Sequence, residues 1–404
     1  MKNENVSNLF NDENVDLDIL KKRAFNYRWA EVPDGVIPLT AADSDFPAAR
    51  EVREALIEYI KSGYFSYTPK KGLPEFISSI ASGIKKRKGI TLDENMILPI
   101  DSAARGMYIT SQAVLQPGDE VIIFDPVDYL FKESALSAGA VPVLYPAKIK
   151  NDRIDVSDIE QYITPRTRMI GLCNPHNPLG ALYSRESLDH LLTIAEKYDL
   201  YIMNDEIWSD IVFPENEFLS ILSLDAARNG RVITIYGFSK SFGLAGLRIG
   251  CIYCFDEIVF SKILDCSEVM TTAGGISSLS QIAGIACMQK TFYWLDEYIR
   301  HLTANRDYAV ERINSIQGLS CRKPEATYLL FIDISKTGLT SQSFVDYVLK
   351  DAKLAIVPGT EQFFGPGAKG YIRLCFATSR GILKEALNRL EQAVHNILKE
   401  KKGS

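Results

Sequence analysis

Short apolar runs rich in β-branched residues recur through the middle of the chain, and segments with helical periodicity separate them. Nearly continuous hydrophobicity of this kind, without alternation, predicts strands of a sheet that is covered on both faces. The five clearest runs are EVIIFD (120–125), RMIGLCN (168–174), LYIMND (200–205), RVITIYG (231–237) and IGCIYCF (249–255).

The segment SRESLDHLLTIAEKYD (184–199), between two of these runs, has the pattern of an amphipathic helix. Leu188, Leu191, Leu192 and Ala195 recur at i, i+3, i+4 and i+7, and Ser184 is a suitable N-cap. Strands that alternate with helices predict a mostly parallel α/β layer from about residue 50 to residue 290.

The C-terminal part of the chain has a different pattern. YLLFIDIS (328–335) and GYIRLCFA (370–377) predict strands, and GILKEALNRLEQAVHNILKE (381–400) predicts an amphipathic helix. We therefore expect a smaller α+β unit here. The sequence contains no internal repeat, low-complexity segment or long linker, so we expect the two units to pack tightly.

Composition narrows the classes of function. The 404 residues include 46% hydrophobic and 24% charged residues, and the net charge is −6. An acidic balance argues against nucleic acid or an anionic membrane as the main partner. No apolar run approaches the ~20 residues that cross a bilayer, and the polar N-terminus lacks a signal core. Seven scattered cysteines suit reduced thiols, so we expect a cytoplasmic protein.

Metal chemistry finds little support in the sequence. Cys251 and Cys254 form a C-x-x-C, but it lies within an apolar run with no second pair, so we interpret it as structural. The four histidines are isolated from one another. We expect no metal site.

Polar residues follow three of the predicted strands, where open α/β sheets bind ligands. Asn174 and Asn177 lie in the turn NPHNPLG, Asp205 and Glu206 end the next strand in NDEIW, and Lys240 follows a third in YGFSK. Each signal alone is weak, because an Asn-Pro turn or an acidic helix cap is common. In this order and spacing they predict one ligand site.

From about residue 26 to residue 398 the sequence resembles the class I and II aminotransferases, which are fold-type I pyridoxal-phosphate (PLP) enzymes. The resemblance rests on ADSDFP, YTPKKGLPE, LQPGDEV, NPHNPLG, NDEIW, SKSFGLAGLRIG and YIRLCFA. It implies a three-layer sandwich with a mostly parallel central sheet. The implied division is a flexible arm at 1–18, a large PLP-binding domain at 48–295, and a small domain at 19–47 plus 296–404.

The resemblance implies the catalytic pair. Lys240 matches the lysine that forms a Schiff base with PLP, and Asp205 matches the carboxylate that keeps the pyridine nitrogen protonated. Once the substrate displaces it, the freed amine of Lys240 is expected to move the Cα proton. Such an enzyme exchanges the amino group of an L-amino acid with a 2-oxo acid.

Further residues of the cofactor site follow from the same resemblance. Asn177 is expected to donate to the phenolic oxygen of PLP, and Arg248 to bind its phosphate, with Ser239 as a second candidate. The loop DSAARGM is expected to offer backbone N–H groups at a helix N-terminus, from Ser102, Ala103 and Ala104.

Three more positions are assigned by the resemblance. Arg373 matches the arginine that grips the substrate's α-carboxylate, where a bidentate pair gives both affinity and orientation. Tyr328 is expected to line the substrate pocket. Tyr67 matches a tyrosine that reaches the phosphate in the neighbouring subunit, which implies a homodimer.

Three positions depart from the family pattern. Trp208 stands where relatives carry tyrosine or histidine; its indole N–H can donate to the phenolic oxygen but cannot transfer a proton. The aromatic residue expected to stack on the cofactor ring falls at Asp128, so either Tyr129 stacks instead or an acid lies against the ring. The lysine that some aspartate-specific relatives use falls at Ala104, which gives no support for a dicarboxylic substrate.

Transamination is the reaction that the sequence favours, because Arg248 within GLAGLRIG resembles the aminotransferases proper. ADSDFP and ATYLLFID resemble the cystathionine β-lyase-like branch, so a C–S β-lyase or another PLP reaction is the alternative. A DNA-binding regulator on this fold would need an N-terminal module larger than the ~25 residues present. A catalytically inactive binding protein is disfavoured because Lys240, Asp205 and Arg373 are all present.

Overall fold

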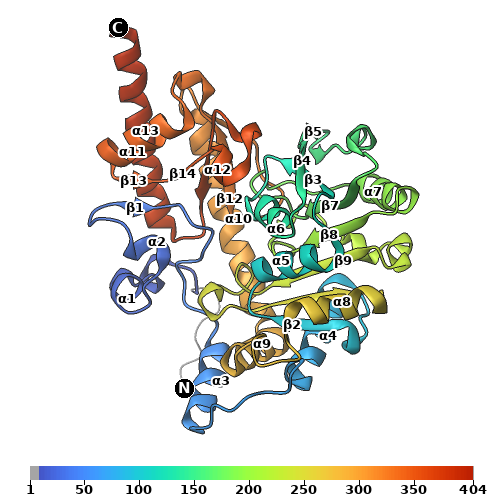
Figure 1. The fold of residues 1–404 in the computed structure, drawn as a ribbon. Coiled ribbons are helices and arrows are strands. Elements are labelled where there is room, and N and C mark those ends of the chain that lie inside the picture. Colours follow the sequence, from blue (N-terminus) through green and yellow to red (C-terminus); the bar gives the residue numbers. More distant parts are fainter. Residues whose placement is uncertain (1–8, 404) are drawn as a thin grey trace.

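A seven-stranded sheet forms the centre of the larger unit in the computed structural model, which describes residues 9–403 (Figure 1). Its strand order is β2-β10-β9-β8-β7-β3-β4. Every residue of β9 is buried, as expected for a sheet covered on both faces. The strands are β2 (Ile97–Ile100), β3 (Glu120–Asp125), β4 (Val141–Pro146), β7 (Thr167–Cys173), β8 (Tyr201–Asp205), β9 (Val232–Gly237) and β10 (Gly250–Cys254).

The sheet confirms the predicted strands and the predicted α/β class. Its neighbouring pairs are parallel except at β10, which runs antiparallel to both β9 and β2. The segment between β9 and β10 contains only the short 3-10 helix η7 (Ala245–Leu247), with no crossover helix. A direct return of this kind makes the two strands antiparallel, and it places residues 238–249 at the edge of the sheet where the predicted ligand site lies.

Helices pack on this sheet in groups. The helix α5 (Ala103–Val114) packs on β8, β9 and β10 with α6 and α8 beside it, whereas α3 and α4 each pack on α9. The predicted helix at 184–199 is α7, and the Ser184 side chain accepts from the Ser187 N–H as its N-cap. The bounds are α3 (Arg50–Lys61), α4 (Pro74–Lys88), α6 (Leu130–Ser137), α7 (Arg185–Lys197), α8 (Glu257–Ser267) and α9 (Ser278–Lys290).

The second unit is built on an antiparallel sheet of order β11-β12-β15-β14. The long helix α10 (Phe292–Ser315) leads into it, and α11 and α13 pack together beside it (Figure 1). The short strand β1 (Ile37–Pro38) pairs in parallel with β13 (Leu354–Ala355), which ties the N-terminal segment to this unit. The remaining bounds are β11 (Ser320–Cys321), β12 (Leu329–Asp333), β14 (Val357–Pro358), β15 (Tyr371–Cys375), α11 (Ser341–Ala352) and α13 (Arg380–Gly403).

The sequence-based domain boundaries remain a prediction. Of the predicted arm at 1–18, residues 1–8 lie outside the described part. Phe10 is buried among the rings of Phe46, Trp294 and Tyr298, and the Asp12 carboxylate accepts from the Gly381 N–H at 2.7 Å. These contacts hold the residues around Phe10 against the body of the protein.

The remaining α-helices and strands are short. None of the helices between residues 9 and 403 combines the length and the apolar composition needed to cross a membrane. The short elements are α1 (Leu17–Lys22), α2 (Tyr27–Ala30), β5 (Ile149–Lys150), β6 (Arg153–Ile154) and α12 (Glu361–Phe364).

Candidate active site

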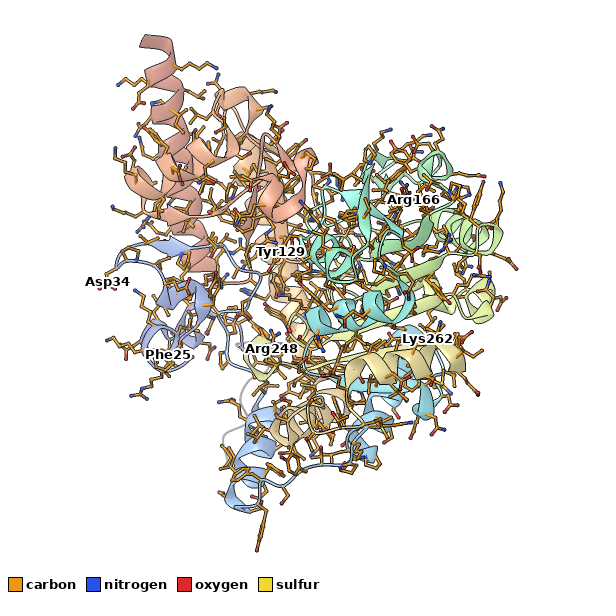
Figure 2. All side chains as sticks on the ribbon, viewed as in Figure 1. Phe25, Asp34, Tyr129, Arg166, Arg248 and Lys262 are labelled. Carbon is orange, nitrogen blue, oxygen red and sulfur yellow. The ribbon has the colours of Figure 1, made fainter. Side chains whose placement is uncertain are left out.

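A cavity of about 740 Å³ lies where the strands of the large sheet end and the small unit meets them. Figure 2 labels two of its lining residues, Tyr129 and Arg248. The predicted site residues on its wall are Ser102, Ala103, Ala104, Asp128, Tyr129, Asn177, Asp205, Trp208, Ser239, Lys240, Arg248 and Arg373. Residues from six different segments, far apart in the sequence, are therefore brought to one cavity.

Lys240 lies in the turn after β9 and carries the only amine on this wall among the described residues. Its Nζ donates to the backbone carbonyl of Ala42 at 2.6 Å and lies 5.6 Å from the centre of the Trp208 ring. Burial lowers the pKa of Lys240, although Asp43 and Asp128 act in the opposite direction. The amine is thus held at a fixed place and is more readily neutral than an exposed lysine.

Asp205 ends β8 and is 7% exposed. Its Oδ1 accepts from the Ile207 N–H at 3.0 Å, but no basic side chain of the described residues forms an ion pair with it. Burial raises the pKa of Asp205 from 3.8 to about 7, and the nearby Asp128 and Glu206 add to this effect. A carboxyl group in this state favours a cationic or proton-donating ligand group beside it.

Arg373 projects from β15 and is 8% exposed. Its Nη1 donates to Asn177 Oδ1 and its Nη2 to the Thr40 carbonyl, each at 3.3 Å, while Nε has no partner among the described residues. No carboxylate of the described residues pairs with it, and burial lowers its pKa. A buried guanidinium with a free N–H suits a carboxylate ligand, because a bidentate pair would satisfy it.

The N-terminus of α5 brings to the same cavity backbone N–H groups that bond to none of the residues 9–403. The Ser102 hydroxyl caps the helix by accepting from the Arg105 N–H at 3.1 Å. A side chain at Gly250 would lie 2.8 Å from the Ala103 nitrogen, so a glycine is required for β10 to pass this close. Arg248 is exposed and adopts a positive φ of 52°. A helix N-terminus and an arginine that pairs with none of the described residues line one cavity here, and together they suit a phosphate.

Asp128 and Tyr129 both reach the cavity wall. Asp128 Oδ2 accepts from Asn177 Nδ2 at 2.9 Å, and Tyr129 is 46% exposed. Trp208 is 2% exposed, and its ring meets the Tyr328 ring edge-on at 4.6 Å. Asp128 and Tyr129, the two candidates for the side chain that lies against the cofactor ring, therefore both line this wall.

Two residues predicted from the sequence, Tyr328 and Tyr67, lie elsewhere, and so does Arg105, the neighbour of Ala104. Tyr328 is fully buried behind Trp208, and its hydroxyl donates to the Ala42 carbonyl at 3.3 Å. Tyr67 is 92% exposed and lies outside the cavity. Arg105 lines a separate, smaller cavity. Arg105 therefore does not bring a basic side chain into the main cavity next to Ala104.

An ion pair and a hydrogen bond behind the cavity wall were not predicted from the sequence. Lys88 Nζ pairs with Glu206 Oε2 at 2.7 Å, and both side chains are almost wholly buried next to Asp205. Asp210 accepts from the Ser241 hydroxyl at 2.9 Å, which fixes the turn that carries Lys240. Lys88 and Glu206 are 118 positions apart, so no local pattern could have paired them.

Comparisons with known proteins show which proteins this chain is similar to. A family model described as aminotransferase class I and II matches residues 34–390. The chain is 30% identical over 364 residues to the aspartate aminotransferase of Pyrococcus horikoshii. The matched region covers 89% of this chain and 91% of that protein. It is 31% identical over 373 residues to aromatic-amino-acid aminotransferase 2 of Thermococcus litoralis, at 91% and 93% coverage. The PLP-bound structure of a Clostridium difficile 630 protein aligns with a TM-score of 0.85 at 26% identity, covering 93% and 96% of the two chains.

Proposed function

Since the chain belongs to the family of class I and II aminotransferases, we propose that the cavity around Lys240, Asp205 and Arg373 is the active site of this PLP-dependent transaminase. The enzyme transfers an amino group between an amino acid and a 2-oxo acid. One observation carries the site assignment: an amine, a carboxyl group and a guanidinium face one cavity, and none of them has an ion-pair partner among the described residues. Such a set of unsatisfied groups fits a ligand that brings the matching charges.

The wall fits the cofactor group by group. PLP, when bound, supplies an electron-accepting ring. The Asp205 carboxylate would hold a proton on the ring nitrogen, which gives this buried group the counter-charge it lacks. The α5 N-terminus, Arg248 and Ser239 would hold the phosphate. The free N–H of Asn177 would face the phenolic oxygen.

The substrate would be held and deprotonated by two residues. Arg373 binds the α-carboxylate through its guanidinium, and this orients the Cα–H bond for cleavage. The Lys240 amine would accept the proton from Cα as general base and could donate it again as general acid. Its lowered pKa keeps more of the amine neutral and able to accept a proton. Trp208 can donate a hydrogen bond but cannot transfer a proton, so proton transfer is assigned to Lys240.

We also propose a homodimer in which Tyr67 enters the partner subunit's site. The segment from α3 to Tyr67 supports this, because it exposes a run of large apolar and aromatic side chains. Their exposed fractions are 53% for Ile57, 51% for Ile60, 78% for Tyr64, 60% for Phe65 and 92% for Tyr67. Contact with a second copy would cover this surface.

The site assignment is tested by Lys240→Ala. We expect the wild-type protein to be yellow with PLP and to form a new amino acid from an added 2-oxo acid, and the variant to lose both properties. The wild-type enzyme should release pyruvate and ammonia from cysteine conjugates only slowly, since the comparisons favour transamination over the C–S lyase alternative. A Lys240→Ala variant that keeps the absorption band and the activity would refute the assignment.

A further inference from the structure

Asp128 stands where an aromatic residue was expected, and both of its carboxylate oxygens have a partner. Oδ1 accepts from the Leu130 backbone N–H at 3.1 Å, and Oδ2 accepts from Asn177 Nδ2 at 2.9 Å. The backbone N–H of Asp128 also donates to the Asn177 carbonyl at 3.2 Å. The turn after β3 is thus tied to the turn after β7 by main chain and side chain together.

The opposite side of the Asn177 amide faces a cation. Arg373 Nη1 donates to Asn177 Oδ1 at 3.3 Å, while Nδ2 donates to the Asp128 carboxylate. Turning the amide over would set its NH₂ group against the guanidinium and its oxygen against the carboxylate. Both contacts would be repulsive, so Asp128 and Arg373 together allow only one orientation of a side chain that is 4% exposed.

This orientation leaves one donor available. Nδ2 carries two hydrogens, and one is taken by Asp128. The second is used by none of the described residues, and Asn177 lies on the cavity wall. A phenylalanine or tyrosine ring at position 128 could pack against the amide but could not accept its N–H and hold it in this orientation.

The hydrogen bond from Leu130, at the start of α6, accounts for only one oxygen of the carboxylate. A serine hydroxyl at 128 could accept from the Leu130 N–H in the same way. It could not also accept from Asn177, because that bond goes to the second carboxylate oxygen, Oδ2, which serine lacks. The two contacts can therefore be separated by substitution.

We infer that Asp128 is a positioning residue that fixes the Asn177 amide so that its free N–H is presented to the phenolic oxygen of bound PLP. This inference rests on the proposed function of the cavity. It goes beyond the family pattern, because the acid replaces the aromatic residue expected there and acts through Asn177.

A double-substitution cycle tests the inference through PLP affinity. The full-length protein is stripped of cofactor and titrated with PLP as wild type, Asp128→Ser, Asn177→Leu and the pair. We expect Asp128→Ser to weaken PLP binding about tenfold when Asn177 is present and by less than about twofold in the Asn177→Leu background. Equal effects in both backgrounds, or a Ser variant that binds PLP like wild type, would overturn the positioning role.

Asp128→Asn is the matched control for charge. Asparagine and serine are both neutral, but only asparagine offers an oxygen that reaches Asn177, so its PLP affinity should lie between those of wild type and Asp128→Ser. The pH at which the bound cofactor's absorption changes should be higher in the Ser variant than in the Asn variant, because a donor to the phenolic oxygen is lost. Identical pH midpoints would contradict the inference, and a wild-type protein that binds no PLP would overturn the proposed function and this inference with it.

Discussion

Asp205 is the residue whose ionisation should depend most on cofactor binding. In the folded protein its pKa is raised to about 7, against 3.8 for the ordinary group. The folded state therefore holds this proton more tightly than the unfolded chain. Its contribution to stability is complete below about pH 4 and is lost as the pH rises through about 7. We expect the Tm of cofactor-free protein to fall between about pH 4 and pH 7.

Asp205→Asn provides the comparison for this pH dependence. The neutral amide cannot ionise, so the Tm of this variant should change less than that of wild type over the same pH range. Adding PLP should flatten the wild-type profile, since the protonated ring nitrogen supplies the missing counter-charge. Thermal unfolding of both proteins with and without PLP measures this, and parallel profiles for the two cofactor-free proteins would count against it.

Ala104 is the residue at which substrate choice should respond to a new charge. It lies on the cavity wall, whereas the neighbouring Arg105 lines a different cavity. We expect Ala104→Lys to raise kcat/KM for aspartate by about tenfold relative to an uncharged amino acid, through a charged hydrogen bond to its second carboxylate. Arg105→Ala, as the control, should leave this ratio unchanged. Steady-state kinetics on both donors measures it, and an unchanged ratio in Ala104→Lys would place the substrate side chain elsewhere.

At the scale of elements, the C-terminal end of α4 contacts the end of β8 next to Asp205. Lys88 and Glu206 form a buried ion pair there, whereas Lys22 pairs with Asp18 at the surface, at 2.6 Å. Breaking a buried pair leaves an uncompensated charge, so Lys88→Met should cost about 3–5 kcal/mol of unfolding free energy. Lys22→Met should cost far less, because water screens an exposed pair.

The double variant Lys88→Met/Glu206→Gln separates charge from packing in this prediction. With the buried carboxylate neutralised, most of the lost stability should return, because glutamine keeps partners for Asn204 and Ser220. Urea denaturation of the four proteins gives the comparison. A double variant no more stable than Lys88→Met would mean that the lysine acts through packing.

At the scale of the whole molecule, the elements that depend on local sequence pattern were predicted correctly. The predicted strand at 120–125 and the capped helix after Ser184 are found within a residue or two, because hydrophobic period and capping act over short distances. The site residues that follow strand ends also reach one cavity, since parallel strands place their carboxyl ends at one edge.

The features that were missed depend on contacts distant in sequence. The reversal of β10 follows from the connection that precedes it, and an apolar run does not encode its own direction. The contact of Asp128 with Asn177 joins turns 49 positions apart. The burial of Phe10 depends on α10, nearly 300 residues away. Local sequence identifies which residues can act, and the tertiary contacts decide which of them meet.

The proposed dimer can be tested by mixing subunits, because a residue that acts in the partner's site behaves differently from one that acts in its own. Tyr67→Ala and Lys240→Ala should each be nearly inactive alone. If Tyr67 enters the partner's site, a hybrid of the two variants contains one intact site, with Lys240 from one chain and Tyr67 from the other. Random reassortment makes half of the dimers hybrids, so activity should return to about a quarter of wild type.

The same mixture distinguishes the alternatives. If Tyr67 acted within its own subunit, every site in the hybrid would lack either Lys240 or Tyr67, and mixing would restore nothing. Sedimentation of the wild-type protein should show a dimer, and charged substitutions at Ile57 and Ile60 should shift it towards the monomer, since these side chains are more than half exposed in the single chain. A monomeric wild type would refute the shared site, whereas a dimer without recovery on mixing would place Tyr67 outside the partner's site.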